Sequence, residues 1–239
     1  TTAIILAAAL TEHGKTVVLI DMDPQGNAST GLGVMRADRK LTSYDVVVDG
    51  ANINDALYDT GVDGLSLVPS DMDLSSAELD LGSMDGRTLM LSKAINQLNY
   101  KPDFVLLDCP PSLSLLTVNA LSAAHSVIVP LQCEFYALEG LSQLLKTIEM
   151  AKANLNPNIK VEGVMLTMYD PRNRLSAQVV EDVRTHLGRA VFNTVIPRNV
   201  RIAEAPSFGL PVTSYDSRSA GAKAYMALAK EILNRRRKD

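Results

Sequence analysis

The sequence predicts an α/β fold: a doubly wound, mainly parallel sheet with helices on both of its faces. Short runs of consecutive apolar residues recur along the chain, and a run that is apolar on both faces is typical of a central strand in a parallel sheet. Helical patterns separate these runs, so strand and helix alternate throughout. Polar residues follow directly after most of the runs, at the place where such sheets bind their ligands.

The strands are predicted from these unbroken apolar runs. The first run, at residues 16–20, reads Thr-Val-Val-Leu-Ile and is followed by Asp21. Four more runs of the same kind and a weaker sixth come after it, at residues 65–69, 104–107, 126–131, 161–167 and, for the weaker one, 191–196. Their length and their lack of polar positions favour buried strands.

The helices are predicted from helix-forming and apolar residues at helical spacing. Residues 1–12 begin with such a pattern, and His13 and Gly14 supply its end. Five further patterns lie at residues 87–98, 114–124, 137–155, 177–187 and 220–236. Residues 38–63 are polar and contain glycine, which indicates a small helical excursion from the sheet. No repeat or linker divides the chain, so we expect a single domain over residues 1–239.

The composition excludes several classes of protein. Of the 239 residues, 46% are apolar, which suffices for one large core. No stretch approaches the roughly 18 apolar residues that a membrane span needs, and no export signal opens the sequence. The two cysteines, Cys109 and Cys133, make no disulfide framework and are interpreted as buried reduced thiols. We therefore expect a cytoplasmic protein.

The charge is unevenly distributed although the net charge is only −4. From Arg172 onward there are 13 basic and 6 acidic residues, a local charge of +7, whereas residues 1–171 carry 10 basic and 21 acidic residues, or −11. This asymmetry fits a surface that faces a polyanion. It fits equally well a solvated helix face with a frayed basic tail at residues 235–238.

Asp108 directly follows the apolar run 104–107. A rigid strand would hold its carboxylate at the rim of the sheet, where it could accept a hydrogen bond from a magnesium-bound water beside a triphosphate. Asp21 and Asp23 follow the first run, and one of them can turn into the same site where the strand ends. Such a carboxylate could orient or deprotonate the water that attacks a γ-phosphate. In both places the alternative is a simple turn or helix cap.

Several long segments resemble one family. Residues 18–33, Val-Leu-Ile-Asp-Met-Asp-Pro-Gln-Gly-Asn-Ala-Ser-Thr-Gly-Leu-Gly, are similar to the A′ segment of the ParA/Soj partitioning ATPases, and residues 103–112 to their Walker B segment. Residues 130–141, 196–201 and 204–211 match later blocks of that family in the same order. The resemblance covers about residues 16 to 220 and implies a P-loop NTPase fold of the deviant Walker type.

The family's phosphate-binding loop lies outside this sequence. Family members open with a strand and a Lys-Gly-Gly-Val-Gly-Lys-Thr loop that runs into Thr-Thr-Ala-Ile, and here the first residues are Thr1 and Thr2. We therefore expect that the chain is truncated and lacks the loop's two lysines and a central strand. The intact protein is expected to hydrolyse ATP to ADP and phosphate, and the 239-residue chain to fold poorly and be inactive.

The resemblance implies a role for individual residues. Asp23 corresponds to the catalytic carboxylate and is a possible magnesium ligand, and Asp108 to the Walker B aspartate, which holds Mg²⁺ through water. Asp21 is expected to be structural. Thr1 and Thr2 follow the family's magnesium-binding threonine, with Thr1 near the α-phosphate. Further nucleotide-binding residues are expected around the adenine: Met168, Pro197, Arg198 and Asn199.

The implied function is a DNA-partitioning switch with ATP and Mg²⁺ as cofactors. An ATP-dependent homodimer would bind double-stranded DNA non-specifically, and a ParB-like centromere-binding protein would stimulate hydrolysis and release. DNA-binding residues are expected in the basic C-terminal region: Arg201 and Arg218, with Arg172, Arg174, Arg184 and Lys223 as further candidates. Such a protein would be associated with the nucleoid and would not bind membranes stably.

Two other functions fit parts of the sequence. A MinD-like membrane-cycling ATPase needs an amphipathic C-terminal helix, and Tyr225, Leu228, Ala229 and Ile232 do form an apolar stripe. The charged residues that end the chain favour a helix docked on the core instead. An iron–sulfur protein of the nitrogenase reductase type needs cysteines that bridge two subunits, and the positions of Cys109 and Cys133 do not favour this.

Overall fold

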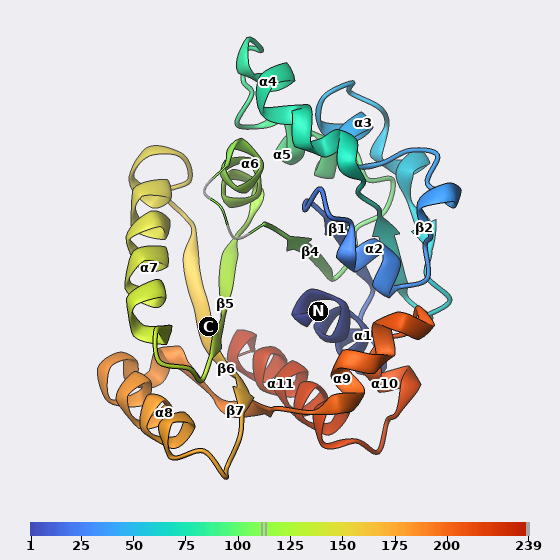
Figure 1. The fold of residues 1–239 in the computed structure, drawn as a ribbon. Coiled ribbons are helices and arrows are strands. Elements are labelled where there is room, and N and C mark those ends of the chain that lie inside the picture. The colour runs from blue at the N-terminus through green and yellow to red at the C-terminus, as the bar shows by residue number, and fades with distance from the viewer. Residues whose placement is uncertain (111, 113, 238–239) are drawn as a thin grey trace.

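A computed structural model describes residues 1–110, 112 and 114–237 (Figure 1). Within this part of the chain, the first sheet has β1 (Val17–Asp21) near its centre, parallel to β3 (Leu65–Val68) on one side and to β4 (Phe104–Asp108) on the other. The short strand β2 (Tyr58–Asp59) extends the sheet antiparallel to β3. Pro111 of the predicted Walker B segment and Lys238 of the basic tail lie outside the described residues.

A second sheet contains β5 (Ser126–Gln132), β6 (Lys160–Tyr169) and β7 (Val191–Pro197), all parallel, with β6 in the middle. Among the described residues, β4 and β5 each pair with a neighbour on one edge only, so the strands form two sheets where the sequence suggested one. The predicted class, parallel strands alternating with helices, is confirmed. The division of the strands into two sheets could not be predicted from the sequence. An apolar run identifies a strand but does not indicate which strands pair with it.

Helices cover both faces of the first sheet, which gives the doubly wound arrangement. Helix α1 (Thr2–Glu12) packs beside α11 (Ala220–Arg236), and both lie on the face to which Val17 and Leu19 point (Figure 1). The same core reaches β6 and β7 of the second sheet through Met165 and Phe192. One hydrophobic core thus joins the two sheets through a pair of helices.

The other face of the first sheet packs against short helices. Val18 and Ile20 of β1 point into a second core, to which four helices contribute: α3 (Ser43–Val47), α4 (Ala77–Gly82), α5 (Met90–Ile95) and α6 (Leu115–Ala123). A third core lies between the second sheet and two longer helices, α7 (Ala137–Asn154) and α8 (Arg174–Leu187). The alternation of neighbouring β1 residues between two cores follows from the period of two along a strand.

The remaining helices are short. They are α2 (Asn27–Gly31), α9 (Val200–Glu204) and α10 (Val212–Tyr215), with five 3-10 turns, η1 (Arg36–Asp38), η2 (Ile53–Ala56), η3 (Met72–Ser76), η4 (Gly188–Ala190) and η5 (Ala205–Phe208). The predicted excursion at residues 38–63 is present as η1, α3 and η2, and it also contains β2. None of the described helices is long and apolar enough to cross a membrane.

The apolar stripe of α11 is part of the core. Tyr225, Leu228, Ala229 and Ile232 are each at most 2% exposed and pack with residues of α1. The interpretation of this helix as docked on the core is therefore confirmed. Because these side chains are buried in the core, they do not form an exposed apolar face that could bind a membrane.

Candidate functional site

Asp108 and Asp21 end neighbouring strands at the same level. They are paired in the register of β4 and β1, and the N–H of Met22 donates to the carbonyl of Asp108 over 2.8 Å. The chain leaving β1 therefore carries Asp23 past the end of β4. Burial raises the pKa of Asp108, and the nearby Asp23 carboxylate raises it further. Both carboxylates line the same cavity.

A cavity of about 360 Å³ lies at this edge of the sheet. Asp23 and Asp108 line it together with residues from three other segments: Thr1, Ile4, Asn27, Thr30, Gly31 and Pro206. Carboxylate, hydroxyl and amide oxygens dominate the polar part of this lining, and such hard oxygen donors suit Mg²⁺ and its bound waters. The cavity lies at the lower end of the volumes of small-molecule sites. The residues present thus fit a magnesium-bound phosphate group.

Asp21 does not line the cavity and instead holds the loop that does. Its carboxylate is fully buried and accepts hydrogen bonds from the N–H of Ser29 at 2.9 Å, from the hydroxyl of Ser29 at 2.7 Å and from the N–H of Asp23 at 3.2 Å. Burial raises the pKa of Asp21, while the bonds from Ser29 act in the opposite direction. This geometry agrees with the expected structural role.

Asp23 is held through its backbone, so that its carboxylate can face the cavity. Its carbonyl accepts from the hydroxyl of Ser70 at 2.7 Å and from the N–H of Gly26 at 2.9 Å. One carboxylate oxygen accepts from the N–H of Gln25 at 3.0 Å. In the described part of the chain this side chain has no ion pair. It is therefore positioned but not neutralised, as a general base or water-orienting group must be.

Arg39 fastens this loop to its surroundings, and the sequence motifs did not reveal it. Its guanidinium donates to the carbonyl of Ser70, to the hydroxyl of Thr30 at 2.8 Å and to the carbonyl of Val34 at 2.9 Å. A longer bond of 3.4 Å reaches the carbonyl of Gly26. Because Thr30 lines the cavity and Ser70 binds the backbone of Asp23, Arg39 connects both sides of the loop that carries Asp23.

Part of the cavity wall comes from the far end of the sequence. Pro206, on η5, lines the cavity beside Ile4 of α1. Just beyond η5, Gly209 has a φ of +66° and approaches Gly33 so closely that a Cβ on Gly209 would lie 2.8 Å from the Cα of Gly33. Glycine is required by both the backbone conformation and the contact. Two backbones thus meet directly at the side of the cavity.

The other predicted nucleotide-binding residues occupy different places. Thr1 lines the cavity, whereas the hydroxyl of Thr2 is hydrogen-bonded to that of Tyr225 at 3.0 Å. Met168 is 38% exposed and has an unusual φ of +57° for a residue other than glycine. Pro197 lies next to Tyr169 in the sheet register, and the N–H of Arg198 donates to the carbonyl of that tyrosine. None of these three strand-end residues lines the cavity.

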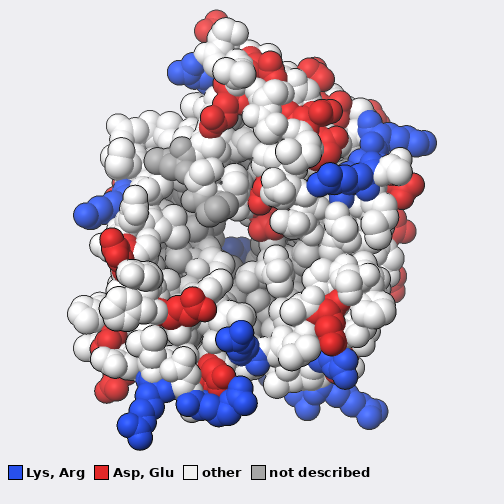
Figure 2. Space-filling model, viewed as in Figure 1, with Lys and Arg blue, Asp and Glu red and all other residues white. Residues whose placement is uncertain are grey.

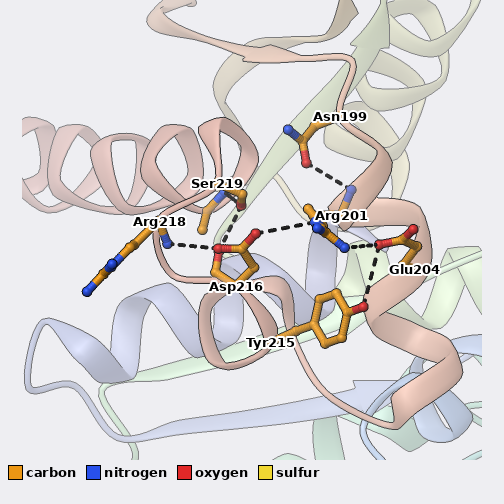
Figure 3. Close-up of polar contacts among 8 residues, drawn as sticks. Asn199, Arg201, Glu204, Tyr215, Asp216, Arg218 and Ser219 are labelled. Carbon is orange, nitrogen blue, oxygen red and sulfur yellow. Dashed lines mark hydrogen bonds and ion pairs between the residues drawn. The ribbon is translucent and has the colours of Figure 1, made fainter.

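Asn199 has a helix-capping role in the structure. Its side-chain oxygen accepts from the N–H of Arg201 at 3.0 Å and so begins α9 (Figure 3). Contacts with adenine by Met168, Pro197, Arg198 and Asn199 stay predictions.

Basic side chains gather along the lower edge of the face shown in Figure 2, over the segments α8 to α11 of Figure 1, while acidic ones prevail toward the top. The predicted DNA-binding residues belong to this basic half but differ in their partners. Arg172 forms a two-bond ion pair with Asp170 at 2.9 and 3.0 Å, which lowers the pKa of Asp170 to about 2. Arg201 is paired with Glu204 and Asp216 (Figure 3). The basic residues of the C-terminal part of the sequence thus lie near one another in the folded protein.

Both cysteines are free thiols, as expected; Cys133 is also buried as expected, whereas Cys109 is only half-buried. Burial, with added repulsion from Asp108 and the other two site carboxylates, raises the pKa of Cys109 to about 12. No group of three or more His, Cys, Asp or Glu side chains that could hold a metal occurs among the residues the structure describes.

Comparisons with known proteins give the family. The family described as "AAA domain" matches residues 1–161. The chromosome partitioning protein ParA of Caulobacter vibrioides is 53% identical over 239 residues, which are 99% of this chain and 90% of that protein. The sporulation initiation inhibitor protein Soj of Bacillus subtilis is 47% identical over 97% of this chain and 92% of its own length.

A solved structure with a bound nucleotide has a similar fold. Cobyrinic acid a,c-diamide synthase from Mycobacterium smegmatis, crystallised with bound ADP and magnesium, matches with a TM-score of 0.83 and 36% identity, over 97% of this chain and 87% of that one. The fold, the paired strand-end carboxylates and these similarities agree. The chain belongs to the ParA/Soj family of chromosome-partitioning ATPases.

Proposed function

We propose that this protein is an ATP-dependent DNA-partitioning ATPase whose ATP-bound dimer binds DNA non-specifically and whose hydrolysis is stimulated by a ParB-like partner. The observation that carries the proposal is the pair Asp23 and Asp108 in one oxygen-lined cavity, in a chain about half identical to partitioning proteins. ATP and Mg²⁺ are the cofactors that this fold and site require.

The residues of the cavity have separate tasks in this proposal. Asp108, on a rigid strand end, would accept a hydrogen bond from water bound to the metal. Asp23, free of ion pairs among the described residues, orients the attacking water and receives its proton. When bound, Mg²⁺ neutralises charge on the phosphates. Thr1 and Thr30 offer hydroxyl groups to the phosphates from the remaining sides.

DNA binding is supported by the basic half of the molecule. Contacts between arginine or lysine and DNA phosphates set affinity without reading sequence. A dimer presents the same set of contacts twice, and the second set binds at a high effective concentration. Closing and opening of the dimer with ATP can therefore change DNA affinity by orders of magnitude, although each subunit makes few contacts. Association with the nucleoid follows.

The test is DNA retention by the full-length protein with ATP or ADP. Asp23→Ala should abolish hydrolysis while ATP-dependent DNA retention survives, because the carboxylate acts after ATP has bound. Asp38→Ala is the matched control: this aspartate is exposed on η1, and its side chain makes no hydrogen bond within the described part of the chain. Equal DNA retention with ADP and ATP would refute the switch. Sedimentation with liposomes should leave the protein in the supernatant, and co-sedimentation would favour the MinD-like alternative.

A further inference from the structure

Arg201 lies between two carboxylates that come from different elements (Figure 3). Its Nη1 is 2.8 Å from Oε2 of Glu204 in α9, and its Nε is 3.4 Å from Oδ2 of Asp216, which follows α10. The hydrogen bond that Arg201 donates to Glu204 is the main cause of a raised pKa at Arg201. The positive charge of Arg201 is thus shared between two negative groups of the same chain.

The cluster extends to the first turn of α11. The second carboxylate oxygen of Asp216 accepts from the N–H of Arg218 at 3.2 Å, and its carbonyl accepts from the hydroxyl of Ser219 at 2.8 Å. Ser219 is the N-cap of α11 and accepts from the N–H of Ala222 at 3.2 Å. Since Asn199 caps α9, Arg201 connects the start of α9 with the start of α11.

Arg218 differs from Arg201 in the contacts of its side chain. Its guanidinium forms no hydrogen bond or ion pair within the described part of the chain, and in Figure 3 it points away from the cluster. Only its backbone is fixed, by Asp216. An arginine that is free at its tip and anchored at its base can give its full charge to a phosphate.

The same cluster adjoins the cavity. Glu204 directly precedes η5, and Pro206 on that turn lines the cavity with Asp23 and Asp108. Tyr215 adds to the connection, because its ring stacks on Phe208 of η5 at 4.9 Å and its hydroxyl lies 3.5 Å from Oε2 of Glu204. The position of α9 relative to α11 is therefore tied to one wall of the cavity.

We propose that Arg201 is a positioning residue, which acts through Glu204 and Asp216 to hold the basic surface in its DNA-binding arrangement, and that Arg218 is the direct phosphate contact. The proposal rests on the proposed DNA-binding function. A phosphate at Arg201 would have to compete with two carboxylates that already satisfy it. At Arg218 there is no such competition.

Neutralising Glu204 or Asp216 distinguishes a positioning role of Arg201 from a direct contact between Arg201 and DNA. The two roles predict changes of opposite sign in DNA affinity. If Arg201 binds phosphate, Asp216→Asn or Glu204→Gln frees its charge and DNA affinity rises. If Arg201 positions the surface, the same variants weaken ATP-dependent DNA binding by roughly three- to thirtyfold, since a dimer loses the ion pair twice. Glu181→Gln is the control: Glu181 is exposed on α8 and, among the described residues, has no ion pair.

The experiment measures the affinity of the full-length protein for duplex DNA with ATP, at several salt concentrations. Arg218→Ala should reduce the slope of log affinity against log salt by about one per subunit. Arg201→Lys keeps the charge but loses the fork that reaches both carboxylates, so positioning predicts a loss close to that of Arg201→Ala. This variant also decides the matter if a carboxylate variant is unstable.

Three results would count against parts of this account. Stronger binding by Asp216→Asn, or nearly full binding by Arg201→Lys, would overturn the positioning role. An unchanged salt slope in Arg218→Ala would overturn the phosphate contact. Absence of ATP-dependent DNA binding in the wild type would instead refute the proposed function itself, so the two failures are distinguishable.

Discussion

Replacing Arg39 with alanine should weaken both the fold and catalysis. The substitution removes a guanidinium that donates to Ser70, Thr30 and Val34. A hydrogen bond from a charged donor contributes about 1.5–3 kcal/mol to the free energy of unfolding. The bonds do not add fully, because Arg39 is only partly buried and the freed carbonyls can bind water. We expect a loss of about 2–4 kcal/mol in the free energy of unfolding.

For a protein of this size, that loss corresponds to a melting temperature lower by roughly 5–15 °C. Catalysis should also fall, because the loop carrying Asp23 loses its attachment to Thr30 and Ser70. We expect kcat to decrease by roughly tenfold with little change in the affinity for ATP, since misplacing a catalytic group affects the reaction more than binding. The assays are thermal melting and steady-state ATPase measurements on the full-length protein.

Arg36→Ala is the matched control for Arg39→Ala. Arg36 lies three residues earlier on η1, is exposed, and its side chain makes no hydrogen bond within the described residues. It should melt within about 1 °C of the wild type. The reasoning about Arg39 would be refuted if its variant melted like this control, or if its reduced activity came entirely from weaker ATP binding.

Three further predictions follow from other contacts. Gly163→Ala would place a Cβ 2.6 Å from the fully buried ring of Phe192, so overpacking should lower the free energy of unfolding by about 1–3 kcal/mol, measured by denaturant titration, and Phe192→Leu should restore it in the double variant. Arg172→Ala should raise the pKa of Asp170 from about 2 toward 3.8, followed by carboxyl NMR; because the folded pKa is the lower one, this ion pair supports folding above about pH 4 and is lost as the pH falls toward 2. Cys109, whose pKa is raised to about 12, should react with iodoacetamide at pH 8 at least about tenfold more slowly than an ordinary thiol, and alkylation as rapid as that of an ordinary thiol would contradict the raised pKa.

The sequence predicted β1 and β3 to β7 from their apolar runs, but not β2, because Tyr58 and Asp59 form no such run. It predicted α5 at residues 87–98 instead of Met90–Ile95, and most of the residues outside these bounds are exposed. It also predicted that Asp23 and Asp108 would share a site. That inference needs only the rule that parallel strands end at one edge of a sheet.

Other features could not be predicted from local pattern. Pro206 lines the cavity nearly two hundred residues after Asp23, and Arg39 lies in a polar stretch without any motif. Both depend on which segments meet after folding. The separate partners of Arg201 and Arg218 are a third case, because their sequence surroundings are equally basic and only the contacts distinguish them.

The meeting of Gly33 and Gly209 has a consequence for how variants of this protein are interpreted. Where two main chains touch with no side chain between them, neither can give way, and a methyl group on either would push α2 and η5 apart. Loss of ATPase activity after substitution at these positions would therefore report a displaced wall of the nucleotide pocket. It would be no sign that either glycine takes part in the chemistry, since neither lines the cavity.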